Sequence, residues 1–183
     1  MALGATIYKF DIDLSNMDKN RYESVSQHIA LHPSETLERM VLRFLAYCVN
    51  MHDQLSFTKG LSADTEPDLW QKSYSNEIEL WIELGLPDIK RIKKAASISQ
   101  QVKLYVYGGQ GVDQWWKLVQ NDCKKFKNVD VYRFDLAAVN QFASQIQRSM
   151  RISVMIQDGL ISFSWDDQML EFPMEIIHDQ EQF

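Results

Sequence analysis

Residues 76–96 place the strongest limits on how this chain can fold. The first half of the stretch, NEIELWIEL, alternates between polar and apolar side chains. A period of two residues is typical of a β-strand with one buried face. We expect the buried face to consist of Ile78, Leu80, Ile82 and Leu84, and the exposed face to consist of Glu79, Trp81 and Glu83.

The second half of the stretch predicts a tight turn followed by a helix. Gly85 ends the strand, and Pro87 fits the first turn of a helix because its missing N–H is not needed there. Asp88 would lie near the positive end of the helix dipole. Apolar residues then recur at helical spacing, at Ile89, Ile92 and Ala96, and the polar side carries Lys90, Arg91, Lys93 and Lys94. The stretch therefore predicts a corner where carboxylates on a strand meet cations on a helix.

Length and charge limit the class of protein. The chain has 183 residues, 45% of them hydrophobic, which is enough for one sizeable core. We therefore expect a single domain over residues 1–183. The net charge of −6 argues against a protein that coats nucleic acid or an anionic membrane nonspecifically, and it is compatible with a local basic groove.

The cysteines and the absence of long apolar runs predict a cytoplasmic location. Cys48 and Cys123 both fall in helical patterns and lack CxxC spacing, so we expect reduced thiols rather than a disulfide or a metal pair. The first ten residues do not resemble a signal peptide, and no apolar run approaches the ~18 residues of a membrane helix. We expect a soluble protein with no membrane partner.

The N-terminal part predicts a hairpin and then a helix. Residues 2–14 alternate in polarity, residues 15–20 have turn composition, and residues 21–32 fit either a helix or a strand. The short turn favours a strand that pairs with the first. The sequence HPSETLERM then predicts a helix with Ser34 as its N-cap, and with Glu35 and Glu38 exposed in its first turns.

Residues 65–73, TEPDLWQKS, allow two structures. Thr65 can cap a short helix. Alternatively, after a strand at 55–58 and a loop at 60–64, residues 69–73 form a strand that pairs with the 76–84 strand. In this hairpin Glu66 or Asp68 would lie beside Glu83, close enough for the carboxylates to share a divalent cation.

The second half of the chain predicts further strands and helices. We expect strands at 102–107 and 129–134, helices at 112–126 and 136–146, and a hairpin around Asp158-Gly159. The 102–107 strand should run parallel to the 76–84 strand, because the helix between them makes a crossover. The glycines at 108–111 lack GxGxxG spacing and are expected to form a loop, so we predict no organic cofactor.

The residues alone leave two explanations for the acidic corner. Zinc spacing, a GxSxG elbow and a P-loop are all missing from the sequence. Carboxylates beside lysines can hold Mg²⁺ and stabilise charge on a phosphate. The simpler explanation, which composition and spacing favour, is that Glu79 and Glu83 form the exposed face of a sheet and the cations the exposed face of its helix.

Fragments in order along nearly the whole chain resemble the YaeQ family of small bacterial proteins. They include ATIYK, HPSET, ERM, LWIELGLPD, RIKKA, WW and IQDG. The resemblance implies an α/β protein with a mixed sheet, built as a variation on the PD-(D/E)xK nuclease core, α-β-β-β-α-β. An added N-terminal hairpin and a C-terminal β-hairpin would complete the fold.

The resemblance also implies site residues. Pro67-Asp68 stands where the superfamily has its PD, and Glu83 stands where it has its D/E. The lysine expected two residues later is absent, because residue 85 is glycine.

In some members of the superfamily this lysine lies on the following helix, where Lys90 and Lys94 share one face. Glu35 resembles the extra acidic residue that often completes the metal site.

Three functional hypotheses follow. In the first, Asp68, Glu83 and Glu35 bind Mg²⁺ or Mn²⁺, and Lys90 or Lys94 assists cleavage of a phosphodiester bond. The alternative is an inactive nuclease-fold module that binds nucleic acid or a protein partner through the basic faces at 90–94 and 117–127. A third hypothesis makes Trp115-Trp116 and the C-terminal hairpin an oligomer or partner interface.

Overall fold

The computed structural model describes residues 4–59 and 65–180, and their contacts divide the chain into two compact units. Residues 4–49 and 137–174 form the first unit. Residues 50–59, 65–136 and 175–180 form the second. The loop expected at 60–64 lies outside the described residues, and the single-domain assignment stays a prediction. No helix in the described ranges is long and apolar enough to cross a membrane.

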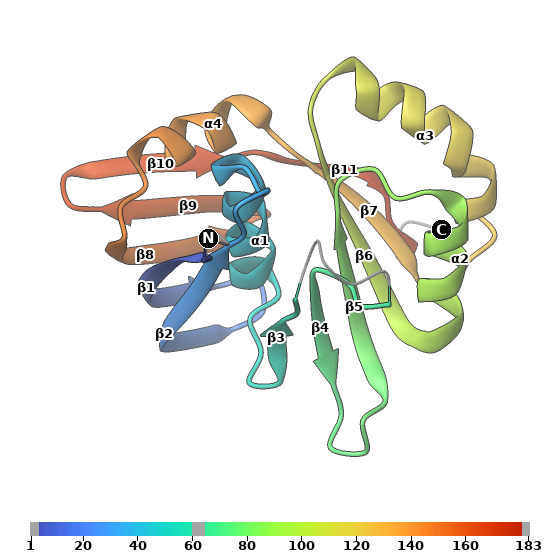
Figure 1. Ribbon diagram of the computed structural model, residues 1–183, viewed down its shortest axis with the longest axis horizontal. Helices are drawn as coiled ribbons and strands as arrows, with labels where there is room; N and C mark the ends of the chain where they lie inside the picture. The colour runs from blue at the N-terminus through green and yellow to red at the C-terminus, as the bar shows by residue number, and fades with distance from the viewer. Residues whose placement is uncertain (1–3, 60–64, 181–183) are drawn as a thin grey trace. The chain divides into compact units, whose positions relative to one another are not determined.

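The first unit is a mixed five-stranded sheet with helices against one face (Figure 1). The strand order is β10-β9-β8-β1-β2, with β1 parallel to β8 and every other pair antiparallel. Its elements are β1 (Thr6–Asn16), β2 (Arg21–Leu31), α1 (Leu37–Val49), nearly all of α4 (Leu136–Gln145), β8 (Ser149–Gln157), β9 (Leu160–Trp165) and β10 (Gln168–Phe172).

An aromatic core holds the first unit together. Phe10 of β1 stacks on Phe44 of α1 with ring centroids 4.3 Å apart. Phe142 of α4 packs edge-on against Phe163 of β9, with centroids 5.4 Å apart. Each fully buried ring of this size contributes roughly 1.5–3 kcal/mol, so these rings stabilise the packing of both helices on the sheet.

The structure confirms both hairpins predicted in this unit. Residues 21–31 are a strand antiparallel to β1, as the short turn favoured. Asp158 and Gly159 join β8 to β9 with φ of 52° and 75°, because a two-residue hairpin turn of this kind requires positive φ at both positions.

The predicted N-cap of the first helix is wrong. Helix α1 begins at Leu37, and Thr36 Oγ1 accepts a hydrogen bond from Arg39 N at 3.3 Å. The hydroxyl of Ser34 instead lies 2.7 Å from His32 Nδ1. The cap therefore falls two residues later than expected, on another hydroxyl side chain of the same HPSET sequence.

The second unit is a mixed six-stranded sheet in the order β11-β7-β6-β5-β4-β3. The pairs β3–β4 and β4–β5 are antiparallel, whereas β5, β6 and β7 run parallel. The parallel pairing of β5 with β6 confirms the prediction for that pair. Its elements are β3 (Leu55–Phe57), β4 (Leu69–Lys72), β5 (Ile78–Leu84), α2 (Ile89–Ile98), β6 (Ser99–Tyr107), α3 (Gln110–Cys123), β7 (Val129–Phe134) and nearly all of β11 (Met174–His178).

Helices α2 and α3 cover one face of β5, β6 and β7 (Figure 1). The shared core includes Trp81, Ile92, Val102, Leu104, Trp115 and Val131. This cover makes the expected exposed face of β5 wrong, because Trp81 is 1% exposed and Glu83 is 7% exposed. Both faces of this strand are buried near its carboxyl end, as is usual where helices cover a parallel part of a sheet.

Three further expectations in the second unit are resolved. Residues 69–72 form a strand, so the hairpin alternative for TEPDLWQKS is confirmed and the helix is wrong. Pro87 lies before α2 rather than in its first turn, because Asp88 is the N-cap. Gly111 belongs to α3, which begins at Gln110, so the predicted glycine loop is shorter than expected.

Candidate functional site: an ion-paired acidic corner

The hairpin of β4 and β5 places Asp68 beside Glu83. Leu69 pairs with Ile82, and Asp68 N donates to Ile82 O at 3.0 Å. Leu84 N then donates to Asp68 Oδ2 at 2.8 Å. Asp68 is thus bonded to the residues on either side of Glu83, and its charge acts on the Glu83 carboxyl group. This is the neighbourhood that the hairpin interpretation predicted.

Glu83 is held by two protein donors. Arg91 Nε donates to Glu83 Oε1 at 2.7 Å, and Trp81 Nε1 donates to Glu83 Oε2 at 3.0 Å. The Glu83 side chain is 9% exposed and the Arg91 side chain 27%. Each carboxylate oxygen of Glu83 therefore accepts one hydrogen bond from a protein side chain.

Helix α2 fixes the position of Arg91. Asp88 Oδ1 accepts a hydrogen bond from Arg91 N at 2.8 Å, which is the usual bond from an N-cap to the third residue of a helix. Arg91 Nη2 donates to Glu66 O at 2.7 Å. The guanidinium thus joins the segment before β4, the end of β5 and the first turn of α2.

Burial raises the pKa of Glu83. Loss of hydration is the main cause, and the negative charge of Asp68 raises the pKa further, whereas the hydrogen bond from Arg91 lowers it. The corner therefore contains a carboxyl group that holds its proton more tightly than an exposed glutamate does.

The cation at the corner is not one of the two lysines that we singled out. Lys90 and Lys94 are both exposed on α2, and none of the contacts to Glu83 comes from either of them. Arg91, between them in sequence, makes the contact instead. Residues 83 and 91 are joined by a tight turn and the start of a helix, and the sequence does not reveal which helical residue turns back toward the strand.

Glu35 forms a separate ion-paired cluster in the first unit. Its Oε1 accepts from Arg39 Nη1 and Arg43 Nε, both at 2.9 Å, and its Oε2 accepts from Arg43 Nη2 at 2.6 Å. Arg43 Nη2 also donates to Ala30 O at 2.7 Å. The expectation of an exposed Glu35 in the first helical turn is wrong, because its side chain is 2% exposed and lies before the helix.

The donor set at the corner does not fit a resident divalent cation as it stands. Mg²⁺ is held by carboxylate oxygens and water, and a protein cation already bound to the carboxylate competes with it. Here Arg91 and Trp81 bind both oxygens of Glu83, and Leu84 N binds Asp68 Oδ2. Over residues 4–59 and 65–180, no group of three His, Cys, Asp or Glu side chains is arranged to hold a metal ion. Arg91 therefore competes with any divalent cation for the Glu83 carboxylate.

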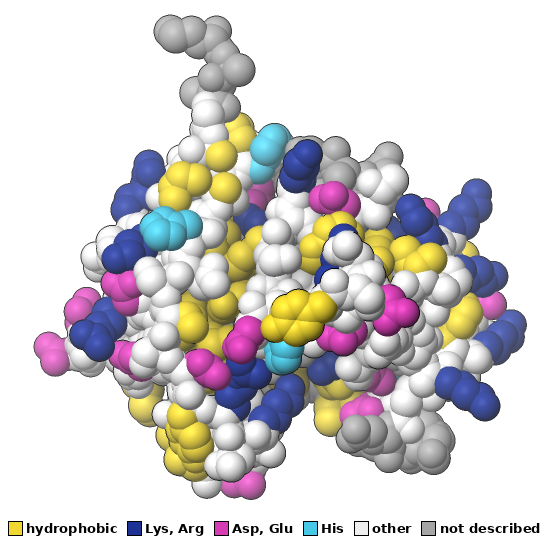
Figure 2. Space-filling model, turned by 90° about the horizontal axis from the view of Figure 1, so that it is seen from below, with side chains coloured by type: hydrophobic (Ala, Val, Ile, Leu, Met, Phe, Trp, Pro, Cys, Tyr) yellow, Lys and Arg dark blue, Asp and Glu magenta, His cyan; other side chains and the backbone are white. Residues whose placement is uncertain are grey.

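Positive charge gathers next to the corner. Residues 88–127 contain nine Lys and Arg against three Asp, a net charge of +6, although the whole chain carries −6. Figure 2 shows several Lys and Arg side chains at the edge of the molecule formed by α2 and α3. Asp122 of α3 pairs with Lys93 of α2 at 3.7 Å and with Lys125 at 3.1 Å, so the lysines of both helices lie on adjoining surface.

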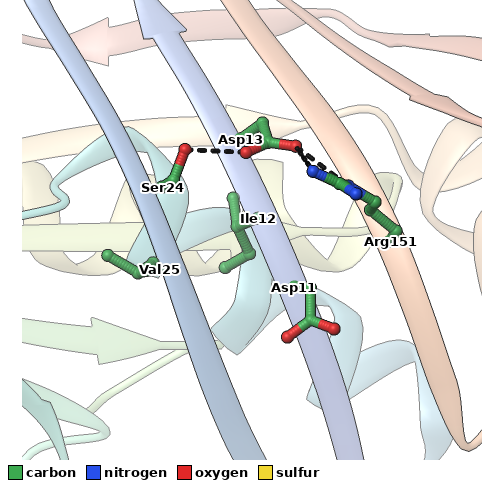
Figure 3. Close-up of a pocket in the computed structure, with 6 residues that line it drawn as sticks. All are labelled: Asp11, Ile12, Asp13, Ser24, Val25 and Arg151. Carbon is green, nitrogen blue, oxygen red and sulfur yellow. Dashed lines mark hydrogen bonds and ion pairs between the residues drawn. The ribbon is translucent and has the colours of Figure 1, made fainter.

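The sheet of the first unit carries a second polar feature. A shallow hollow of about 300 Å³ is lined by Asp11, Ile12, Asp13, Ser24, Val25 and Arg151 (Figure 3). Ser24 Oγ donates to Asp13 Oδ1 at 2.7 Å, and Arg151 Nε donates to Asp13 Oδ2 at 3.2 Å. These hydrogen bonds lower the pKa of Asp13. The contacts form a cross-strand network that joins β2, β1 and β8.

The structure defines a mixed α+β protein, with two mixed sheets and, in the described residues, four helices. The chain belongs to the YaeQ family, whose model, described as YaeQ protein, matches residues 1–174. The uncharacterized protein YaeQ of Escherichia coli (strain K12) is 44% identical over 174 residues, covering 93% of this chain and 94% of the relative. The uncharacterized protein YaeQ of Salmonella typhi is 42% identical over 164 residues, covering 90% and 91%.

Crystal structures of family members have the same fold. The YaeQ protein from Xanthomonas axonopodis pv. citri superposes with a TM-score of 0.92 at 37% identity, over 95% of this chain and 98% of that chain. The YaeQ protein from Pseudomonas syringae gives a TM-score of 0.90 at 35% identity, over 96% and 97%. The family resemblance drawn from the sequence is thereby confirmed.

Proposed function

We propose that this protein is a nuclease-like module that binds nucleic acid without cleaving it. The observation that carries the proposal is the bond between Arg91 and Glu83, at 2.7 Å. In this arrangement a protein cation neutralises the carboxylate that a nuclease of the PD-(D/E)xK type would use to bind a metal ion.

Two features of the chain support the nuclease-like ancestry. The elements from α1 to β6 follow the order α-β-β-β-α-β that the superfamily core has. The resemblance assigns Asp68 and Glu83 to the acidic positions of the superfamily, and the charge of Asp68 acts on Glu83. Gly85 supports the loss of phosphodiester cleavage, because the lysine that would orient water or stabilise a phosphate is missing at this position.

The competing hypothesis is metal-dependent cleavage of a phosphodiester bond by Asp68 and Glu83. The raised pKa of Glu83 favours it, since part of the rise comes from repulsion by Asp68, and a bound cation would relieve that repulsion. In that case Arg91 would leave Glu83 when Mg²⁺ or Mn²⁺ binds, and Lys90 or Lys94 would assist.

Titration calorimetry with Mg²⁺ and with Mn²⁺ separates the two hypotheses. The proteins are wild type, Glu83→Gln and Arg91→Met, with Lys90→Met as a control that removes a neighbouring charge but none of the contacts to Glu83. We expect no binding heat in wild type or in Lys90→Met. Binding by wild type that disappears in Glu83→Gln, together with metal-dependent cleavage of DNA or RNA, would overturn the proposal.

The proposal places the protein in the cytoplasm. Cys48 and Cys123 are both free and buried, and thiols stay reduced in that compartment.

A further inference from the structure

Helices α2 and α3 present a lysine surface with few acidic partners. We define this surface by Lys90 and Lys94 of α2, Lys117 of α3, and Lys124 and Lys127 just after it. All five are exposed, and none of them forms an ion pair with any residue in the described ranges. Lys93 and Lys125 share Asp122 and border the same surface.

We infer that this lysine surface binds the phosphate backbone of a nucleic-acid duplex. The inference names the ligand and the surface for the binding role proposed above, and it rests on that proposal only for the class of partner. The acidic corner takes no part in it.

The charge balance is the first argument. A chain with a net charge of −6 places a net +6 within residues 88–127, so the rest of the molecule carries −12. Unpaired lysines on adjoining helices repel one another, and this repulsion is relieved when an anionic polymer covers them. Each phosphate that a lysine neutralises also releases condensed counterions from the nucleic acid, which favours binding.

The composition of the surface favours a nucleic acid over an acidic protein. Protein interfaces are depleted in lysine and centred on buried aromatic, Met or Arg anchors. Here Arg91, the one arginine of α2 and α3, is bound to Glu83. The exposed large apolar side chains of the two helices are Ile98, at the end of α2, and Leu118 of α3. Lysines on flexible stems contact phosphates as point charges without reading bases.

The orientation of the tryptophans favours a duplex over a single strand. Proteins that bind single strands stack the bases on exposed aromatic rings. Trp115 is 7% exposed and donates its Nε1–H to Pro87 O at 2.8 Å. Trp116 is partly buried against the core cluster, with its ring 5.9 Å from that of His178. Both tryptophans of α3 therefore pack inward, and the surface offers charge without a stacking platform.

Fluorescence anisotropy tests the inference with a labelled duplex DNA of mixed sequence, about 20 base pairs long, in EDTA. EDTA removes divalent metals, so the result does not depend on the acidic corner. If five phosphates are neutralised, the affinity should fall about 10²–10³-fold between about 50 and 200 mM KCl, a logarithmic slope of about −4.5.

Matched triple variants locate the surface. Lys94→Gln with Lys117→Gln and Lys124→Gln should make the slope shallower by about two to three and weaken binding at least about tenfold at low salt. The control, Lys9→Gln with Lys59→Gln and Arg148→Gln, removes the same charge elsewhere and should bind like wild type. Circular dichroism confirms that both variants fold.

Several outcomes would overturn the inference. An equal loss of duplex affinity in both triple variants would mean that binding depends on the net charge of the protein rather than on this surface. Preference for the single strand of the same sequence, or displacement of the duplex by an equal charge concentration of polyglutamate, would exclude a duplex-specific surface. Cleavage in Mg²⁺ with the variant effects unchanged would instead refute the non-cleaving module and leave the lysine surface standing.

Discussion

Arg91 Nε lies 2.7 Å from Glu83 Oε1, so that the first turn of α2 is bonded to the end of β5 across Gly85. The same guanidinium reaches Glu66 O, in the segment before β4. One residue therefore ties together the three parts of the chain that meet at the acidic corner. This ion pair has consequences for stability that can be measured.

Arg91→Met should destabilise the protein by about 1–3 kcal/mol, because it leaves the buried Glu83 carboxylate without its charged partner. Urea unfolding at neutral pH measures the change. Lys90→Met, one residue away and unpaired in the described part of the chain, should stay within about 0.5 kcal/mol of wild type.

Adding Glu83→Gln to Arg91→Met should recover part of the lost stability, because the uncompensated negative charge is then removed. Strict additivity of the two substitutions would argue against the ion pair.

The raised pKa of Glu83 predicts the sign of a pH effect. An unfolded glutamate titrates near about 4.3, and the folded group titrates higher. The contribution of Glu83 to stability is therefore fully present below the unfolded pKa and is lost as the pH rises through the folded pKa. Relative to Glu83→Gln, wild type should lose unfolding free energy as the pH rises from about 4 toward 7.

Urea midpoints of both proteins across this range give the comparison. Arg91→Met should steepen the loss, since the hydrogen bond that lowers the Glu83 pKa is gone. A difference between wild type and Glu83→Gln that grows with pH would show that the Glu83 pKa is lowered instead.

Local patterns predicted much of the fold. The alternation in β1 and β5, the Asp158-Gly159 turn and the helical spacing in α2 each depend on neighbouring residues, and all four elements form. Burial of Trp81 and Glu83 could not be read from alternation, because it arises when α2 and α3 pack on the sheet. The local pattern of polar and apolar residues predicts a strand or a helix, but it does not predict which elements pack against each other.

The acidic site was only partly predictable. The resemblance placed Asp68 and Glu83 at one corner, and the register of β4 and β5 brings them together. The choice of Arg91 over Lys90 and Lys94 depends on how α2 is turned, which the sequence does not specify. For Glu35 part of the signal was local, because Arg39 follows at four residues, a spacing that suits an ion pair on a helix. The contact with Arg43, eight residues away, lies outside that rule.

The ion-paired cluster of Glu35 predicts that this residue contributes to the stability of the protein and does not bind a metal ion. Glu35→Ala should destabilise the protein by roughly 3–5 kcal/mol, because Arg43, with its side chain 6% exposed, loses the carboxylate that compensates its charge. Thermal unfolding measures the loss. Glu38→Ala, in the first turn of α1, should change stability by less than about 1 kcal/mol. Loss of metal binding in Glu35→Ala at wild-type stability would instead make Glu35 a ligand.

Gly85 predicts the result of restoring the missing lysine. Its φ is +92°, a conformation that side chains with a Cβ rarely adopt, although a Cβ there would meet no atom within 4 Å. Gly85→Ala and Gly85→Lys should therefore each cost about 1–2 kcal/mol through backbone strain rather than through a clash. Gly111→Ala in α3, where φ is not positive and space is also open, should be neutral or stabilise by up to about 1 kcal/mol.

Urea unfolding of the three variants separates strain from space, and a cleavage assay on Gly85→Lys tests the corner itself. The lysine would project from a strained turn beside a glutamate that Arg91 already neutralises, so we expect no metal-dependent cleavage of DNA or RNA. Cleavage by Gly85→Lys that is lost in the double variant with Glu83→Gln would mean that the ion pair yields to a metal. The corner would then be an active site that lacks one side chain, rather than a site in which Arg91 prevents metal-dependent cleavage.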